Sequence, residues 1–411
     1  MPATDSIVVP PRTASAPASV PSASRTRFGF VLAVVAQILM MVAASAPSPF
    51  YPVLAQEIGF DSVVISAVFA VYAVALLLTL LTAGSLSDHI GRRPVAIAGF
   101  VLLAISMLLF WHADAVAILF LARIAQGIAS GLLIAALSAT VLDFAPTDRP
   151  QRAALWNSLS PGIGLALGAL VSGVMLDLTR DALVDVFSAL TVIYVAIAVL
   201  LLFLPETAPR KPGAWASLSF RLSIPASIRT DFWRSAPAVV AGWATGGLFL
   251  SLGANIVRGE LGGTAHVWQG LTVALLAGVG AVTAFVMRGR RARTMTIFGT
   301  AALAAGTALS LAALATGSLA FYLVAAGITG MGFGTAFSGV VASLAPRIPA
   351  SERADAFAVI YLLAYLAFGV PAVLAGMLVG VFGLGPVCVG YGLAVIALAL
   401  VALVLRVRRA E

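Results

Sequence analysis

Twelve long apolar stretches constrain the fold of this chain more than any other feature of its sequence. A helix needs about twenty apolar residues to cross roughly 30 Å of membrane hydrocarbon, and each stretch is close to that length or longer. Eleven of the twelve contain no Asp, Glu, Lys, Arg or His, and the exception holds Arg123. Backbone groups in lipid must be hydrogen-bonded within their own segment, so we expect each stretch to be a helix. The predicted spans are approximately 28–50, 62–84, 94–111, 116–142, 154–176, 186–205, 235–256, 267–287, 295–314, 319–344, 356–380 and 386–405.

The composition excludes a soluble protein. Of the 411 residues, 61% are hydrophobic and only 10% are charged, whereas a soluble domain is nearer half apolar and a quarter charged. Too few polar residues remain to coat this much apolar surface in water. The sequence therefore predicts an all-α membrane protein.

The N-terminal region is predicted to contain a disordered tail and then a retained helix. Residues 1–27 are rich in Ser, Pro, Ala and Thr and have no apolar core of their own. The first span ends in Pro49-Phe50-Tyr51-Pro52, where a signal peptide would have small residues at a cleavage site. Cys388 is the only cysteine, which excludes an intramolecular disulfide.

The distribution of Lys and Arg predicts the orientation of the chain. If the N-terminus is cytoplasmic, 21 of the 24 basic residues fall in cytoplasmic loops and tails. Arg180 and Arg258 fall outside, and Arg123 lies within a span. This asymmetry follows the positive-inside rule, so we expect a multi-pass protein of the cell membrane with both termini in the cytoplasm. It also argues against a nucleic-acid partner, because the charges lie at helix ends and form no single patch.

A central cytoplasmic loop at 206–234 divides the spans into two groups of six. It separates an N-terminal six-helix bundle at 28–205 from a C-terminal one at 235–405, and a short cytoplasmic tail follows at 406–411. Because six is even, both halves enter the membrane in the same direction, which predicts a parallel repeat with a solute path between the halves. Five pairs of identical residues, each 203 positions apart, indicate a duplication: Gly127 and Gly330, Gly131 and Gly334, Pro146 and Pro349, Ala153 and Ala356, and Gly173 and Gly376.

The most specific motif is the turn between the second and third spans, which reads Gly84-Ser85-Leu86-Ser87-Asp88-His89-Ile90-Gly91-Arg92-Arg93-Pro94. Its two glycines permit a tight turn, and Asp88 lies near Arg92 and Arg93, with which it can form charge-assisted hydrogen bonds. This turn closely resembles the signature loop of the major facilitator superfamily.

The resemblance implies the fold of that superfamily, with twelve transmembrane helices in two pseudo-symmetric six-helix bundles. It also implies that Asp88, Arg92 and Asp143 form a cluster that latches the cytoplasmic ends of the two halves. Helix number, duplication and the exit Pro205-Glu206-Thr207 extend the resemblance over the chain from residue 28. The second half keeps only a degenerate copy of the turn, Arg288-Gly289-Arg290-Arg291.

Arg123 is the one charged residue within a span. It belongs to Leu121-Ala122-Arg123-Ile124-Ala125-Gln126-Gly127, which resembles the helix-four motif of the superfamily, where the arginine is linked to proton transfer. A charge at this depth is costly unless it faces a cavity or a partner. Two interpretations stay open: a counter-charge for a substrate or a coupled proton, and a structural arginine bonded to helix carbonyls.

Small residues in the fourth and fifth spans predict close helix packing, because glycine lets helix backbones approach one another in lipid. The antiporter branch of the superfamily has a Gly-Pro pair in helix five, but here Ala169 stands where that proline is expected, and the proline comes earlier. Packing alone therefore explains these residues about as well as antiport does. The predicted packing residues are Gly127, Gly131, Pro161, Gly162, Gly164, Gly168 and Gly173.

The resemblance implies a cavity lined by the first, second, fourth, fifth, seventh, eighth, tenth and eleventh helices. Polar and aromatic residues of these helices are the candidates for substrate contact, although each aromatic could equally face lipid. Aromatics with few polar groups are typical of small-molecule pockets. Besides Arg123, the candidates are Gln37, Tyr72, Trp156, Asn157, Trp243, Asn255, Tyr361 and Tyr365.

These patterns predict a secondary transporter that works by alternating access, not an enzyme. We expect proton-coupled efflux of a drug-like compound or metabolite, within the efflux branch of the superfamily. The alternative is uptake of a small organic anion or sugar, with Arg123 as the counter-charge. A receptor would need a sizeable sensor domain, and intramembrane catalysis would need His or acids in the spans. No cofactor or metal is predicted. The expected partners are a small-molecule substrate, membrane lipid and protons, and the family implies that a monomer suffices.

Overall fold

The computed structural model describes residues 23–146, 148–149, 151–208, 211–214, 218, 222–349 and 352–408. Most of the predicted N-terminal tail and the last three residues lie outside this part of the chain. Within it, eleven helices are long and apolar enough to cross a membrane, and a bent helix pair brings the number to twelve. The predicted all-α membrane fold is confirmed.

Six helices form the N-terminal half, with shorter helices at both of its ends. The short helices are α2 (Tyr51–Ile58), which follows a turn at 46–50, and α4 (Leu86–Ile90) in the glycine-containing turn. The long helices are α1 (Ala23–Ser45), α3 (Ser62–Ala83), α5 (Arg92–Trp111), α6 (Val116–Asp143), α7 (Gln151–Leu178) and α8 (Ala182–Leu202).

The C-terminal half repeats this pattern. Its first helix, α9 (Arg229–Ser251), begins six residues before the predicted start of the span at 235. The chain bends by 61° between α9 and the segment Gly253–Glu260, which contains α10 (Gly253–Asn255). The other five are α11 (His266–Met287), α12 (Ala292–Thr316), α13 (Leu319–Leu344), α14 (Arg353–Phe382) and α15 (Leu384–Val407).

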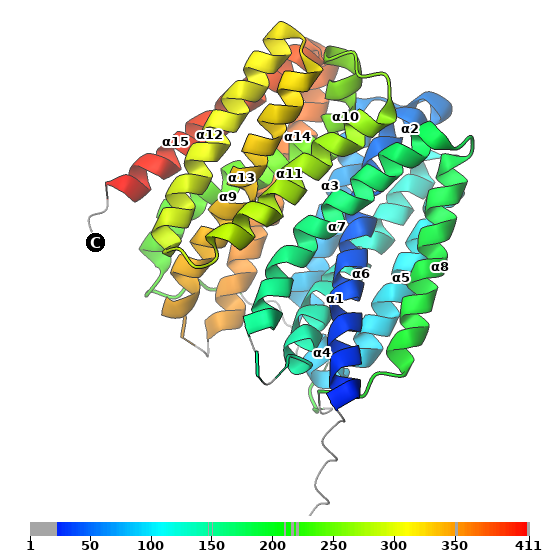
Figure 1. Cartoon of the computed structure of the whole chain (residues 1–411), viewed down its shortest axis with the longest axis vertical. Coiled ribbons are helices and arrows are strands. Elements are labelled where there is room, and N and C mark those ends of the chain that lie inside the picture. Colours follow the sequence, from blue (N-terminus) through cyan, green and yellow to red (C-terminus); the bar gives the residue numbers. More distant parts are fainter. Residues whose placement is uncertain are drawn as a thin grey trace, which may run out of the picture.

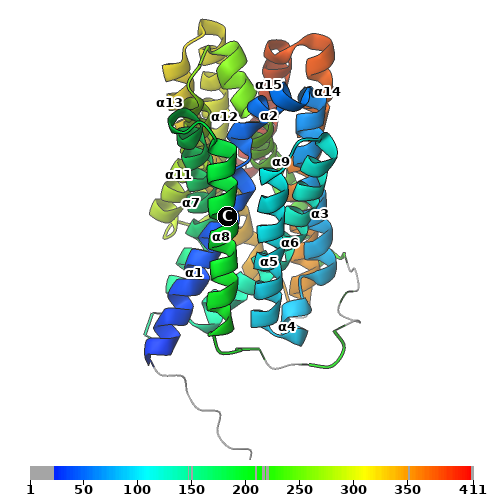
Figure 2. The same cartoon turned by 90° about the vertical axis from the view of Figure 1, so that its right-hand side faces the viewer.

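The two halves lie side by side, and each brings several helix ends to the same end of the molecule (Figures 1 and 2). We call the end at which α1, α5 and α9 begin the basic end, because Arg92, Arg93, Arg229 and Arg234 lie there. The other end, where α11 begins, is the opposite end. In Figure 1 the halves meet towards the opposite end and diverge towards the basic end.

The 203-residue repeat is visible in the packing between the halves. Gly173 of α7 lies against Gly270 of α11, so closely that a Cβ on Gly173 would stand 2.8 Å from the carbonyl oxygen of His266. Gly376 of α14, 203 positions later, packs in the same way against Ser66 of α3. Two pseudo-equivalent crossings, α7 with α11 and α14 with α3, therefore hold the halves together. Close backbone approach at small residues supplies the dispersion contacts that bind helices in lipid.

Candidate functional site

A cavity of about 330 Å³ lies between the two halves. It is lined by α1, α3, α6 and α7 from the first half and α9, α11, α13 and α14 from the second, the same eight helices that the resemblance implied. Six of the predicted cavity residues line it: Gln37, Tyr72, Asn157, Trp243, Tyr361 and Tyr365.

Aromatic rings form most of one wall of this cavity. The ring of Trp243 lies 5.0 Å from that of Tyr365, 5.4 Å from that of Phe337 and 5.7 Å from that of Phe368, measured between centroids. These are edge-on arrangements, which the quadrupoles of aromatic rings favour. Phe69 of the first half extends the wall, with its centroid 4.8 Å from that of Phe368.

Amide and hydroxyl groups lie on the other side, on α1, α6 and α7. The Asn157 amide nitrogen donates to the carbonyl oxygen of Ser138 at 3.1 Å, and Gln37 Nε2 lies 3.3 Å from the Ser138 hydroxyl. Ser138 therefore fixes one side chain from each of two neighbouring helices. Among the described residues that line the cavity there is no Asp, Glu, Lys, Arg or His.

Two predicted cavity residues lie elsewhere. Trp156 packs against the core of the N-terminal half. Consecutive helical residues point about 100° apart, so Trp156 and its neighbour Asn157, which lines the cavity, face different directions. Asn255 lies in α10, beyond the bend that follows α9, and does not line the cavity. The hydrophobic pattern predicted one continuous span at 235–256 and did not predict that bend.

Sequence reasoning missed the phenylalanines and Ser138. Phenylalanine faces lipid as readily as it faces a cavity, so composition does not separate the two. A signal existed in the spacing: Phe333 and Phe337 are four apart, and Tyr361, Tyr365 and Phe368 follow at intervals of four and three. Such intervals place side chains on one face of a helix.

Arg123 is fully buried in α6 and does not line the cavity. Its Nε donates to the Tyr51 hydroxyl at 2.7 Å, and Nη1 donates to the Ala44 carbonyl at 3.3 Å and to the Gln126 amide oxygen. Its guanidinium carbon lies 5.4 Å from the centroid of the Tyr72 ring, which does line the cavity. Arg123 thus stands one side chain behind the cavity wall. Among the described residues no carboxylate lies within 4 Å of it, and one of its three partners is a helix carbonyl, as the structural interpretation expects. The role of Arg123 stays a prediction.

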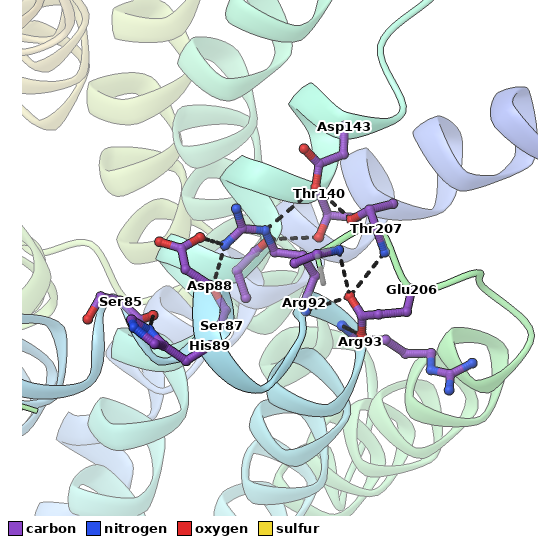
Figure 3. Close-up of polar contacts among 12 residues, drawn as sticks. Ser85, Ser87, Asp88, His89, Arg92, Arg93, Thr140, Asp143, Glu206 and Thr207 are labelled. Atoms are coloured by element: carbon purple, nitrogen blue, oxygen red, sulfur yellow. Dashed lines mark hydrogen bonds and ion pairs between the residues drawn. The ribbon is translucent and has the colours of Figure 1, made fainter. Parts of the chain in front are cut away.

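The turn at the basic end brings the predicted charged residues together (Figure 3). Arg92 pairs with Asp88, its Nη1 donates to the Ser87 hydroxyl at 2.8 Å, and its Nε lies 3.5 Å from the Asp143 carboxylate. Within the described residues, the partners of this cluster lie in the first half or at the start of the central loop that follows it. The cluster implied by the resemblance is present, and its role as a latch between the halves stays a prediction.

Glu206, which follows α8, is a central member of this cluster that sequence reasoning did not select. Its carboxylate accepts from the backbone N–H of Arg92 at 2.8 Å and of Arg93 at 3.1 Å. It therefore caps the beginning of α5, where unsatisfied N–H groups and the helix dipole favour an anion. In the other direction, the Arg93 side chain at the start of α5 donates to the carbonyls of Leu202 and Leu204 at the end of α8. The exit from α8 and the start of α5 thus stabilise one another.

The predicted packing glycines lie at helix crossings. Gly164 and Gly168 pack against α1, Gly162 and Gly173 against α11, and Gly127 and Gly131 against α3, each with neighbouring backbone or Cβ atoms where its own Cβ would be. Pro161 lies inside α7 and lines the cavity.

Hydrogen bonds join the halves at the opposite end. The Ser48 hydroxyl donates to the Leu250 carbonyl at 2.6 Å, and both groups are buried. The Asp177 carboxylate, at the end of α7, accepts from the backbone N–H of His266 at 2.9 Å and of Val267 at 2.8 Å, which begin α11. His266 Nδ1 also lies 2.9 Å from this carboxylate.

The chain is similar to known transporters in sequence and in fold. The family described as Major Facilitator Superfamily matches residues 33–308. The multidrug resistance protein MdtL of Klebsiella pneumoniae (strain 342) is 27% identical over 305 residues, which cover 70% of this chain and 74% of that protein. The quinolone resistance protein NorA of Staphylococcus aureus (strain N315) is 20% identical over 132 residues, 32% of this chain and 34% of NorA.

Two solved structures share the fold at low sequence identity. The nucleoside transporter NupG superposes with a TM-score of 0.68 at 13% identity, over 92% of this chain and 99% of that one. A bacterial homolog of the human lysosomal transporter Spinster, in an inward-facing and unoccupied conformation, gives a TM-score of 0.70 at 14% identity, over 94% and 96%. The family match spans more than half of the sequence, and the fold is shared with these two solved structures over 92% and 94% of the chain. The chain therefore belongs to the Major Facilitator Superfamily and is a multi-pass membrane transporter.

Proposed function

We propose that this protein exports small, largely apolar compounds across the cell membrane by alternating access, in exchange for protons. The observation that carries the proposal is the cavity between the halves, which is rich in aromatic rings and has no charged side chain among the described residues that line it. Such a lining is typical of pockets for drug-sized molecules. The relatives named for multidrug and quinolone resistance support export as the direction.

The basic end is proposed to face the cytoplasm, because cytoplasmic loops of membrane proteins carry an excess of Lys and Arg. In that orientation the halves are joined at the outer side and diverge towards the cytoplasm (Figure 1), which corresponds to an inward-facing state. A single chain is proposed to suffice, since both walls of the cavity come from it.

The alternative, uptake of an organic anion or sugar, has less support. Its motivation was Arg123 as a counter-charge, yet this side chain lies behind Tyr72 and is bonded to Tyr51, Ala44 and Gln126. Sugar uptake would be favoured by a mainly polar lining, whereas most of the residues that line this cavity are apolar or aromatic.

Proton exchange is testable in proteoliposomes with an acid-loaded lumen and a pH-sensitive dye. Addition of an exported compound should raise the lumenal pH as protons leave. The Trp243→Ala variant should slow this by about tenfold, because it removes the centre of the aromatic wall. Trp268→Ala, which alters a tryptophan outside the cavity, is the control. Flux of the compound without a pH change would rule out proton antiport.

Alternating access requires the contacts at the opposite end to break and reform. Asp177→Asn leaves one acceptor oxygen where the carboxylate now accepts from two backbone N–H groups, so the outward-open population should rise by about fivefold to tenfold. Ala44→Cys in a Cys388→Ala background reports this opening, since Ala44 lines the cavity. Its labelling by an impermeant maleimide outside whole cells should accelerate accordingly.

Asp114→Asn is the matched control, because Asp114 is exposed in a loop at the same end. Equal labelling rates in the two Asn variants would show that Asp177 does not hold the outer side closed.

A further inference from the structure

The cavity has two chemically different walls, and the polar one contains hydrogen-bond acceptors that have no donor within the described part of the chain. Gln37, Ser138 and Asn157 supply the polar wall, from α1, α6 and α7. Buried acceptors without a donor cost free energy, so they are uncommon in folded proteins and call for an explanation.

The clearest of these acceptors is the side-chain oxygen of Asn157. Its amide nitrogen donates to the Ser138 carbonyl. A carbonyl can only accept, so the group that faces it must be the NH₂. This fixes Oδ1 as the free group, which is buried and has no hydrogen-bond donor within the described part of the chain.

A second acceptor belongs to the same residue. Pro161 lies inside α7 four positions after Asn157. In a helix the carbonyl of Asn157 would accept from the N–H of the residue at 161, but proline has no N–H. The backbone oxygen of Asn157 therefore lacks its usual donor, one turn away from a proline that also lines the cavity.

Gln37 places a second amide beside Ser138, from α1, although a hydroxyl both donates and accepts and so does not by itself orient this amide as the carbonyl orients that of Asn157. Its Nε2 lies 3.3 Å from the Ser138 hydroxyl, and its Oε1 is likewise buried with no donor among the described residues. Ser138 thus holds one amide from each flanking helix.

The opposite wall offers aromatic faces instead of charges. Trp243 lies with Tyr365, Phe337 and Phe368 around it, with centroids 5.0 to 5.7 Å from its own. Aromatic faces carry negative partial charge and attract cations, tryptophan most strongly.

We propose that this cavity selects aromatic ammonium compounds that carry at least one N–H. The proposal rests on the proposed function, in which this cavity is the substrate site. The aromatic body packs against Trp243 and its neighbours, and the ammonium N–H donates to the oxygens of Asn157 and Gln37. A quaternary ammonium can use only the aromatic faces, because it has no N–H to donate. An organic anion would gain nothing from the acceptor oxygens and aromatic faces, and the described residues that line the cavity offer it no Lys, Arg or His as a counter-charge.

The test is binding to purified protein in nanodiscs, measured by isothermal titration calorimetry. Three probes share one aromatic body: 1-naphthylmethylammonium, its N,N,N-trimethyl analogue and 1-naphthylacetate. Hydrogen bonds between charged and neutral groups are stronger than neutral ones, so the first probe should bind wild-type protein about tenfold more tightly than the second. Asn157→Leu should remove that difference. Asn255→Leu, the same change outside the cavity, should keep it.

Equal affinity for the N–H and trimethyl probes in wild-type protein would overturn the proposal, and this comparison needs no variant that might misfold. Tighter binding of the naphthylacetate, or no binding of the ammonium probe at all, would overturn it as well. Because the readout is binding, a protein that binds as expected but exports nothing would contradict the proposed export alone.

Discussion

Arg123→Met should destabilise the folded protein while leaving ligand binding largely intact. The side chain is fully buried and bonds to Tyr51, Ala44 and Gln126. Removing the guanidinium leaves its buried polar partners without a donor, and it also leaves a poorly filled space. Both effects are costly, so we expect the free energy of unfolding to fall by about 2–4 kcal/mol. Arg123→Lys should not restore stability, because an ammonium does not reproduce the fixed fork of the guanidinium.

Thermal stability in detergent, followed by size-exclusion chromatography after heating, measures the first effect. Affinity of the protein that remains folded should change less than about threefold, since Arg123 does not line the cavity. Arg258→Met, at an exposed arginine, should be neutral in both measurements. The reverse pattern, a variant as stable as wild type that no longer binds, would restore Arg123 to the role of a substrate counter-charge.

Gly91→Ala should impair both stability and transport. Gly91 has φ +112° and ψ 149°, a conformation that is essentially limited to glycine, and forcing another residue into it costs about 1–3 kcal/mol. A Cβ here would also overlap the Glu206 carboxylate. If Glu206 moves away, α5 loses the cap on its first N–H groups. The loss of this cap should destabilise the folded protein by about a further 1 kcal/mol.

The degenerate copy of the turn in the second half offers the control. Gly289 has no neighbouring atom within 4 Å of its Cβ position and no positive φ, so Gly289→Ala should be close to neutral. The double variant Gly91→Ala with Glu206→Ala removes the overlap but keeps the backbone strain, and it should remain less stable than Glu206→Ala alone. Equal melting temperatures for the Gly91 and Gly289 variants would contradict this account of the turn.

Composition and periodicity determined the class of this protein. In lipid, a long uncharged stretch must hydrogen-bond its backbone N–H and C=O groups within itself, which it can do as a helix. Twelve such stretches therefore predict twelve helices. The 203-residue repeat predicted the two halves, and the crossings at Gly173 and Gly376 follow it. The resemblance of the turn at 84–94 to the signature loop of the superfamily implied the cluster of Asp88, Arg92 and Asp143, in which local spacing accounts only for the pairing of Asp88 with Arg92.

Tertiary structure decided which side chains meet. Asn157 and Trp156 are adjacent in sequence, but helical geometry sends them to the cavity and to the core of one half respectively. The bend after α9 removes Asn255 from the cavity. The environment of Arg123 depends on Tyr51 and Ala44, which are 72 and 79 positions away. A hydrophobic pattern shows only that a residue is shielded from water. In a membrane protein such a residue can face lipid, a neighbouring helix or a substrate cavity, and the pattern is the same in all three cases.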